Sequence, residues 1–183
     1  MVQLTTSERC TTPGMTFQIG EKVVYPNHGV GTIENISSRA FGTRYERFYL
    51  LRLNVNNMTV MVPCSHADGV GLRKVTKTSE VAKVLCFLAG GKCSSNRDWK
   101  DRFKENSERM QHGGLLDVAE VLKALLILQI QKPLSFREKK MLDRARQMLI
   151  IEVCTARMMR ELDAAELLDQ ALLKSGLRLP APL

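Results

Sequence analysis

The sequence lacks the residue patterns on which metal sites, disulfide frameworks and common enzyme active sites depend. Only three histidines occur in 183 residues, and no CxxC pair, Walker loop, GxSxG or HExxH motif is present. The five cysteines are spread along the chain: Cys10, Cys64, Cys86, Cys93 and Cys154. An odd number of separated cysteines is typical of reduced thiols in a cytosolic protein. We therefore predict a protein that is not an enzyme and needs no metal, cofactor or small-molecule substrate.

Long hydrophobic runs are also missing. No stretch approaches the roughly 20 apolar residues of a transmembrane helix, and residues 1–16 contain no hydrophobic segment of signal-peptide length. These absences predict a soluble, cytoplasmic protein with no membrane partner. The hydrophobic content of 44% is ordinary for a globular protein, so the chain can still form a core.

Negative charge is in short supply. Lysine and arginine together number 27, against 19 aspartates and glutamates, which leaves a formal net charge of +8. The excess is spread along the chain and is not concentrated in a polybasic tail. Such a balance favours nucleic acid or another acidic partner.

Residue patterns divide the chain into four segments. Residues 1–16 are rich in threonine, so we predict a disordered lead-in. Residues 17–75 carry strand signals, and residues 76–176 carry helix signals. We interpret residues 177–183 as a flexible tail. The predicted fold class is α+β, with a small β domain followed by an all-α domain of about five helices.

Short strands are predicted in the first domain, separated by turn residues at regular spacing. They cover residues 22–25, 30–36, 48–53, 58–62 and 71–75, with a hairpin loop at residues 39–44. This spacing is typical of a Tudor-like or SH3-like barrel. In the fourth strand, alternation places Val60 and Val62 on one face and Met61 on the other. Met61 is thus a candidate for an apolar contact with a partner, and ordinary barrel packing is the alternative.

Helices are predicted throughout the second domain. They begin near residues 78, 95, 115, 135 and 163, and apolar residues recur in them at intervals of three and four. Ser135 and Glu138 fit a capping box at the start of the fourth helix. Arg137, Lys140 and Arg144 share one face of that helix, which is either solvated or a contact for a polyanion.

The only tryptophan, Trp99, lies in the first turn of the second predicted helix. Ser95 and Asp98 fit a capping box just before it. The cations around it on this helix are Lys100, Arg102 and Lys104. An aromatic ring among cations, near the positive end of a helix, suits a polyanion with stackable bases. The alternative is that Trp99 packs in the core and the charges form a solvated face.

Five segments, taken in order, carry a resemblance to a known family. They are residues 17–31 (FQIGEKVVYPNHGVG), 61–63 (MVP) and 70–73 (VGLR), then Trp99 with its basic neighbours, and residues 134–149 (LSFREKKMLDRARQML). Each is modestly specific alone, and together they make a specific match from about residue 17 to residue 172. The chain resembles the CarD/CdnL family of bacterial transcription regulators.

This resemblance implies a non-enzymatic regulator of transcription initiation. The N-terminal domain would bind the RNA polymerase β subunit through the positions Arg39, Leu51, Met61 and Pro63. The helical domain would meet promoter DNA, weakly and without sequence preference, through the positions Trp99, Lys100, Arg102 and Lys104. By the same resemblance, Trp99 is a wedge that enters the minor groove at the upstream edge of the transcription bubble and stabilises the open promoter complex.

A second interpretation is a Tudor-like module that binds nucleic acid or protein as a scaffold, without a role at promoters. It shares the barrel and the basic charge. A reader of methylated ligands needs an aromatic cage, and residues 17–75 contain no tryptophan to build one. Substituting Trp99 separates the two interpretations, because a scaffold that still folds would leave transcription unchanged.

Overall fold

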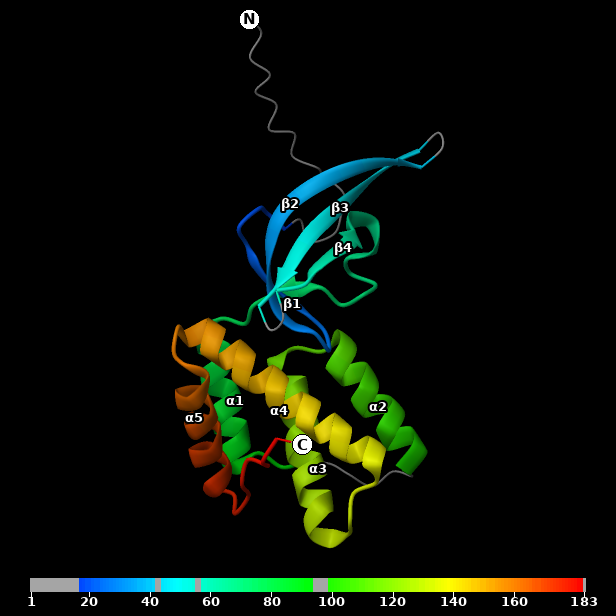
Figure 1. The fold of residues 1–183 in the computed structure, drawn as a ribbon. Coiled ribbons are helices and arrows are strands. Elements are labelled where there is room, and N and C mark those ends of the chain that lie inside the picture. Colours follow the sequence, from blue (N-terminus) through cyan, green and yellow to red (C-terminus); the bar gives the residue numbers. More distant parts are fainter. Residues whose placement is uncertain (1–16, 42–43, 55–56, 94–98, 183) are drawn as a thin grey trace, which may run out of the picture.

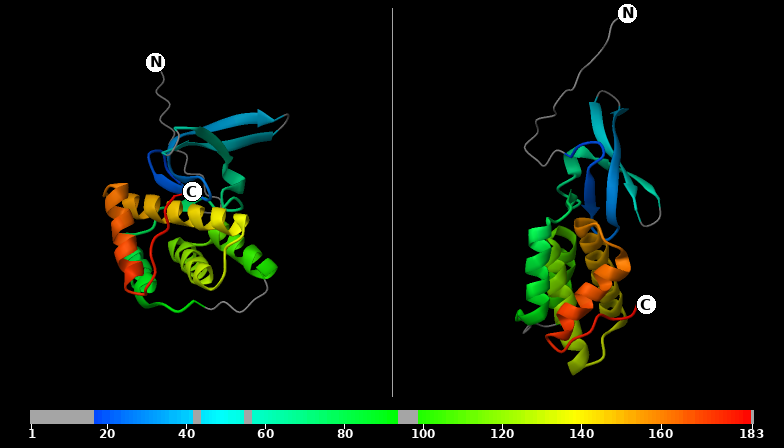
Figure 2. Two further views of the ribbon diagram at one scale, coloured as in Figure 1. Left: turned by 60° about the horizontal axis from the view of Figure 1, so that its bottom comes forward. Right: turned by 90° about the vertical axis from the view of Figure 1, so that its left-hand side faces the viewer.

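The chain forms a β-sheet joined to a group of helices (Figure 1). The structure, a computed structural model, describes residues 17–41, 44–54, 57–93 and 99–182. Two further views show the helices packed together at one end of the sheet (Figure 2). This arrangement confirms the predicted α+β fold class, with the β part first and five helices after it. The predicted lead-in, residues 1–16, lies outside the described residues.

All strands of the sheet pair in antiparallel fashion, in the order β4-β3-β2-β1-β5. They are β1 (Lys22–Tyr25), β2 (Gly29–Phe41), β3 (Arg44–Leu53), β4 (Thr59–Pro63) and β5 (Arg73–Lys74), with a 3-10 helix at Cys64–His66 after β4. Because β4 and β5 are the two edges, the described sheet is not closed by strand pairing. The sheet is thus an open form of the predicted small barrel, with the gap between β4 and β5.

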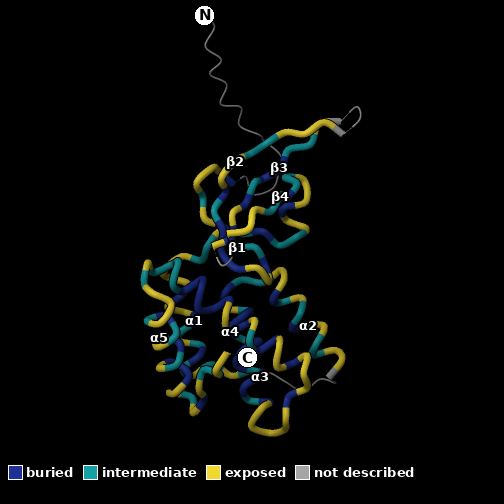
Figure 3. Tube along the Cα trace, in the orientation of Figure 1, coloured by how far each residue is buried: buried dark blue, intermediate teal, exposed yellow. Residues whose placement is uncertain are grey.

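The hairpin of β2 and β3 is longer than predicted. The two strands remain paired from Ile36 opposite Tyr49 to Phe41 opposite Arg44, across most of the segment that we predicted to be a loop. Its far part projects from the molecule (Figure 1) and carries mainly exposed and half-buried residues (Figure 3). Strand pairing through backbone hydrogen bonds needs no particular side chain, so residues 38–41 could form a strand without a hydrophobic alternation to reveal it.

The sheet has its own core. Its most buried apolar residues are Phe17, Val23, Ile33, Leu51, Leu53, Val62 and Leu72. The ring of Tyr49 packs edge-on against Phe17, with 5.6 Å between the ring centroids. These side chains come from the inward positions of four strands and the flanking loops, as a sheet that curls around one core requires.

The helices surround a second, larger core. They are α1 (Thr78–Gly90), α2 (Trp99–His112), α3 (Leu115–Gln131), α4 (Phe136–Arg157) and α5 (Glu161–Leu173). Val118, Leu122 and Leu125 of α3 are almost completely buried, because α3 contacts α1, α2 and α4. None of the helices in the described parts of the chain combines the length and the hydrophobicity that crossing a membrane requires.

The start of α4 confirms the predicted capping box. Ser135 Oγ accepts a hydrogen bond from the backbone N–H of Glu138 at 3.3 Å, and Glu138 Oε2 accepts one from the backbone N–H of Ser135 at 2.9 Å. Two backbone donors that the helix itself cannot satisfy are thereby paired.

The end of the chain is more ordered than predicted. Gly176, with φ of 74°, reverses the chain after α5. The backbone N–H of Leu177 then donates to the carbonyl of Leu172 and that of Gly176 to the carbonyl of Leu173, both at 3.0 Å. This Schellman pattern turns the Leu177 side chain into the helical core. The prediction that the flexible tail begins at residue 177 is therefore wrong for Leu177.

Gly71 is a position where the sheet meets the helices without room for a side chain. Its φ is 77°, and a Cβ there would lie 2.2 Å from the carbonyl oxygen of Gln111, at the end of α2. The same Cβ would lie 2.9 Å from Cγ of Pro26, which is also too close. Gly20 has a similar φ of 85°, but a Cβ there would meet nothing within 4 Å. Substituting Gly20 thus adds backbone strain alone, whereas substituting Gly71 adds backbone strain and a steric clash.

We predict that Gly71→Ala lowers the thermal stability of the protein more than Gly20→Ala. Both variants place alanine in the left-handed region, at a cost of about 1–2 kcal/mol. Only Gly71→Ala adds a clash with backbone at the junction, which costs a further amount on the order of 1–3 kcal/mol. Thermal unfolding followed by circular dichroism compares the two midpoints. Equal losses would contradict the close approach of Gly71 to α2.

Candidate functional site

Three of the four positions predicted to contact polymerase lie on one face of the sheet. The cross-strand pairs are Arg39 with Glu46, Met61 with Leu50, and Pro63 with Phe48. Residues that pair across strands point to the same face, and alternate residues of β3 share a face. Arg39, Met61 and Pro63 therefore point to the same side, away from the core of the sheet. We call Arg39, Leu50, Met61 and Pro63 the outer sheet face.

Leu51 does not belong to that face. Its side chain is 0% exposed in the core of the sheet, opposite Val60. The prediction that Leu51 contacts a partner is therefore wrong for this conformation. The sequence prediction missed Leu50, which is half-buried and faces outward beside Met61. Both residues are leucine, so alternation alone could not decide which points outward, and only the register with β4 does so.

The outer sheet face has an apolar part and a charged part. Met61 and Pro63 are half-buried and lie on β4, whose far edge has no strand partner among the described residues. Arg39 is exposed on the projecting ribbon. Its partner Glu46 is four residues along β3 from Leu50, or about 13 Å at the usual rise per strand residue. A partner that contacts both parts must therefore cover a surface longer than 10 Å. The unpaired edge of β4 also offers backbone groups to which a strand of the partner can add.

Trp99 is the first described residue of α2, and the predicted helix start near residue 95 lies outside the described residues. The Trp99 side chain lies outside what the structure describes, as do Ser95 and Asp98 of the predicted capping box. Lys100 and Lys104 are exposed on α2. Phe103, one turn after Trp99, is half-buried and packs against the helical core. The apolar side of α2 thus faces the core, and two of its three predicted cations face solvent.

Arg102 differs from the other two cations. Its Nη2 lies 3.3 Å from Glu138 Oε1, and the two side chains are only 15% and 11% exposed. Arg102 therefore ties α2 to α4, and its predicted contact with DNA stays a prediction. The distance of 36 residues between the partners explains why no local pattern indicated the pair.

Glu138 takes part in both the capping box and the ion pair. Its burial favours the neutral acid, but hydrogen bonds from Ser135 and the nearby Arg102 guanidinium favour the carboxylate more strongly. The pKa of Glu138 therefore lies below its ordinary value of 4.5. The carboxylate is ionised at neutral pH and holds the first turns of two helices together.

The first turns of α2 and α4 meet at a basic corner of the molecule. The Arg102–Glu138 contact brings them together, and Figures 1 and 2 show the two helix starts side by side. The exposed cations of this basic corner are Lys100, Lys104, Arg137, Lys139 and Lys140. Two helix N-termini add partial positive charge at the same place. The corner therefore suits a polyanion such as nucleic acid.

Phe136, the first residue of α4, also lies at this corner. It is 71% exposed, with Lys140 Nζ 4.7 Å from the centre of its ring. A large aromatic side chain is seldom left exposed to solvent, and one stacked under a cation can contact a ligand. The sequence prediction did not select Phe136. Its position directly after the N-cap Ser135, as a large apolar residue before the buried stripe, was the available signal.

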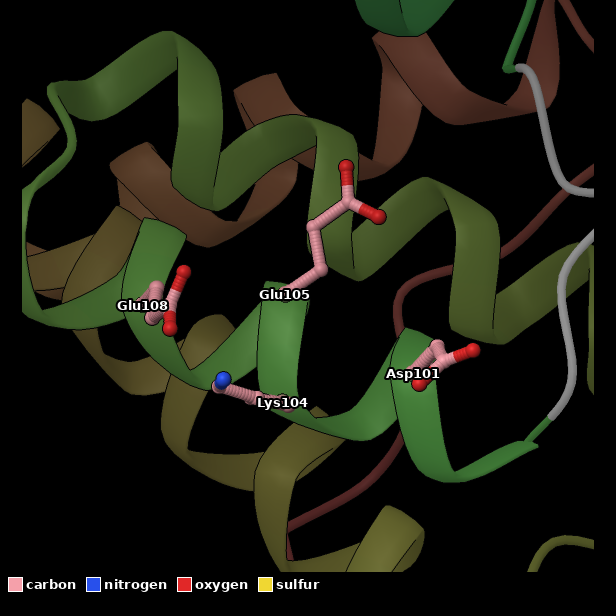
Figure 4. A pocket seen from close by; sticks show the side chains of 4 residues that line it. All are labelled: Asp101, Lys104, Glu105 and Glu108. Atoms are coloured by element: carbon pink, nitrogen blue, oxygen red, sulfur yellow. The ribbon is translucent and has the colours of Figure 1, made fainter.

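A shallow hollow on α2 has the opposite charge. It is lined by Asp101, Lys104, Glu105 and Glu108, which come from successive turns of the helix (Figure 4). Glu105 is also bonded to Arg109 at 2.9 Å. Three carboxylates against one ammonium disfavour an anion in this hollow, so Lys104, which lines it, is a weaker phosphate contact than a cation at the start of α2.

The described residues thus combine an outward sheet surface with a basic helical corner. No group of three or more His, Cys, Asp or Glu residues within the described ranges could hold a metal ion.

Two family models match the chain: "CarD-like/TRCF RID domain" over residues 17–76, and "CarD, C-terminal domain" over residues 83–169. The chain is also 36% identical over 137 residues to a protein of Bacillus subtilis (strain 168) named "Putative transcription factor YdeB", covering 75% of this chain and 90% of that protein.

These matches define the class of the protein as a transcription regulator. The chain belongs to the CarD family, as the resemblance implied. The match to the RID domain indicates an interaction with RNA polymerase, and the family is one of transcription factors and not a known enzyme family.

The pairing of Arg102 predicts separate effects for two cations of α2. We expect Arg102→Ala to lower the free energy of unfolding by on the order of 1–3 kcal/mol, because Glu138 loses a partner while buried. Lys104→Ala, an exposed change on the same helix, should stay within about 0.5 kcal/mol. Chemical denaturation measures both. Equal effects would contradict a structural role for Arg102.

The pH dependence offers a second measurement on the same variant. Because the pKa of Glu138 is lowered in the folded protein, its contribution is present above pH 4.5 and is lost as the pH falls through the folded pKa. Without Arg102, one cause of the lowered pKa is removed. The acid-induced loss of stability should therefore be smaller in Arg102→Ala than in the wild type.

Proposed function

We propose that the sheet binds the β subunit of RNA polymerase through its outer face, and that the basic corner contacts promoter DNA at the upstream edge of the transcription bubble. The protein then stabilises the open promoter complex in the cytoplasm. One observation carries the proposal: a single chain of this family presents an apolar outward sheet surface on one domain and a basic corner on the other, and α2, which carries Trp99 as its first described residue, contributes to that corner.

The contact with polymerase is supported by the chemistry of the outer sheet face. Met61 and Pro63 offer apolar surface beside an open strand edge, and Arg39 adds a cation on the ribbon. Leu50 replaces Leu51 in the proposed contact set, since it faces outward beside Met61. An interface of this kind gains from burying apolar area, and the open edge of β4 adds possible backbone pairing.

The contact with DNA is supported by the basic corner. Arg102 pairs with Glu138, and the exposed cations of α2 are Lys100 and Lys104. The exposed Arg137, Lys139 and Lys140 of α4 lie at the same corner and extend the positive surface. Phosphate contacts carry no sequence information directly, so the binding is expected to be weak and without sequence preference.

Trp99 would act where DNA is already opening. Separating a base step costs a few kcal/mol, and an aromatic ring that fills the gap offsets part of that cost. The cost is lowest at the edge of the bubble, where the next base pairs have already separated. The regulator would therefore bind the open complex more tightly than the closed complex and shift the population toward it. No covalent bond is made or broken in this mechanism.

Attachment to polymerase would make a weak DNA contact effective. Once the sheet is bound, the basic corner is held near the promoter at a high effective concentration. A contact that is weak with isolated DNA can then matter in the assembled complex. The two binding surfaces are thus expected to act together.

We predict that Met61→Glu weakens binding to the polymerase β subunit. The substitution would bury an unpaired carboxylate in the interface, at a cost of on the order of several kcal/mol if water is excluded. The dissociation constant for purified β subunit, measured by calorimetry, reports the change.

Ile19→Glu is the matched control for that measurement. Ile19 is 61% exposed and precedes β1, which two strands separate from β4 in the sheet. The control should bind as the wild type does. A folded Met61→Glu variant with unchanged affinity would remove Met61 from the interface.

We predict that Trp99→Ala shortens the lifetime of open promoter complexes while polymerase binding stays intact. Losing the ring removes about 1–3 kcal/mol of stacking, and a loss of about 1.4 kcal/mol that acts only in the open state corresponds to a tenfold change in its stability. Trp99→Phe should give an intermediate lifetime. Decay of open complexes after addition of a competitor measures the effect.

Thermal unfolding of the same variants tests the alternative that Trp99 belongs to the core. In that case Trp99→Ala would lower the melting temperature markedly and all activities would fall together. Leu162→Ala is the control, since Leu162 is 74% exposed on α5, away from the basic corner. A stable Trp99→Ala variant with wild-type decay would overturn the wedge mechanism.

A further inference from the structure

The junction between the sheet and the helices contains a fully bonded pair of opposite charges. Arg73 of β5 donates from Nη1 to Glu152 Oε1 at 2.6 Å and from Nη2 to Glu152 Oε2 at 2.7 Å. Its Nε donates to the carbonyl of Gly113 at 3.2 Å. Glu152, in α4, also accepts from the backbone N–H of Thr76 at 3.1 Å and from its hydroxyl. We call these four residues the interdomain junction.

The junction connects two parts of the helical domain to the sheet. Arg73 reaches α4 through Glu152 and the turn between α2 and α3 through Gly113. Beside it, Val24 and Val30 of the sheet pack against Ile151 of α4. The sheet therefore touches both α4 and the C-terminal end of α2, where Gly71 already requires close contact.

The chemistry of this pair favours one orientation. A guanidinium is planar, and a bidentate pair with a carboxylate constrains its direction as well as its distance. Glu152 is 1% exposed, so the pair is little screened by salt. A buried ion pair contributes little net stability compared with apolar residues, but separating its partners is costly. Rotating one domain against the other would break these bonds, so the pair selects a single arrangement.

That arrangement has a direct consequence for α2. The junction holds the C-terminal end of α2, while Trp99 is at its N-terminal end. With 14 residues, α2 is roughly 20 Å long. A rotation of about 10° at the junction would move the Trp99 end by roughly 3.5 Å, close to the rise of one base along a DNA strand. A rotation of this size between the two domains would thus displace the Trp99 end of α2 by about one base step.

We propose that Arg73 is a positioning residue, which together with Glu152 sets the orientation of α2 relative to the outer sheet face. Binding of the sheet to polymerase then determines where Trp99 meets the DNA. The inference rests on the proposed function, because it explains how one binding surface directs the other. Neither Arg73 nor Glu152 contacts polymerase or DNA in this mechanism.

The first experiment measures whether the two domains move as one body in the full chain. Backbone ¹⁵N relaxation gives a rotational correlation time for the sheet and for the helices. The wild type should show one common value. The double variant Arg73→Ala/Glu152→Leu removes both charges, so it leaves no buried charge unpaired and should fold. In it, we expect the sheet to tumble faster than the helices.

Lys74→Ala is the matched control. Lys74 is the neighbour of Arg73 in β5, and it forms an ion pair with Glu21 within the sheet at 2.7 Å. The control removes a cation and an ion pair at the next position without touching the helical domain. It should keep the common correlation time. Arg73→Lys, which keeps the charge but loses the planar bidentate contact, should fall between the control and the double variant.

The second experiment measures open-complex lifetime with purified polymerase for the same proteins. We expect the double variant to shorten the lifetime on the order of tenfold, since a loosely held domain loses effective concentration at its target. Its affinities for the β subunit alone and for DNA alone should match the wild type within about twofold, because the surfaces themselves are intact. A merely structural role would change all three measurements together.

The outcomes separate the inference from the proposed function. If the wild type leaves the open-complex lifetime unchanged, the proposed function fails and this inference fails with it. If the wild type prolongs the lifetime and the folded double variant does so equally, only the inference is overturned. A common correlation time for both domains in the double variant would also overturn it.

Discussion

The orientation of the two domains depends on the contact between Arg73 and Glu152. This pair joins residues 79 positions apart, and it is the point where a β-strand, the short linker and a long helix meet. Both oxygens of the carboxylate and all the donor nitrogens of Arg73 have partners. Because a buried charge without a partner is costly, the domains can separate or rotate only by breaking several bonds at once. The relative positions of the outer sheet face and the basic corner follow from this constraint.

The surfaces themselves have different chemistry, as their partners would require. The outer sheet face is apolar near the β4 edge and suits a protein. The basic corner collects cations and the positive ends of α2 and α4, and it suits a polyanion. Arg102 illustrates how a cation can serve the corner indirectly. By pairing with Glu138 it brings the two helix starts together, and it leaves the exposed lysines and Arg137 to face outward.

Much of the fold could be predicted because its signals are local. The five helices follow from apolar residues at intervals of three and four, and the Ser135–Glu138 capping box marks the start of α4. The errors occurred where local signals were ambiguous. The β2–β3 ribbon extends on backbone pairing without apolar alternation, and Leu177 is buried because Gly176 reverses the chain into the core. A signal for the second case was present, since a glycine followed by a leucine at a helix end is typical of a Schellman motif.

The sequence by itself determined the fold class, the five helices that the described residues form, the family and the place of Trp99 on α2, because each depends on residues close together in the chain or on motifs in order. Only the tertiary structure decided that Leu51 is buried and Leu50 faces outward, since two adjacent leucines fit either face until the register with β4 is known. It alone decided that Arg102 is paired with Glu138 and Arg73 with Glu152. A glutamate within the apolar run of residues 148–153 hinted at a buried partner, but packing between distant segments chose which arginine it would be.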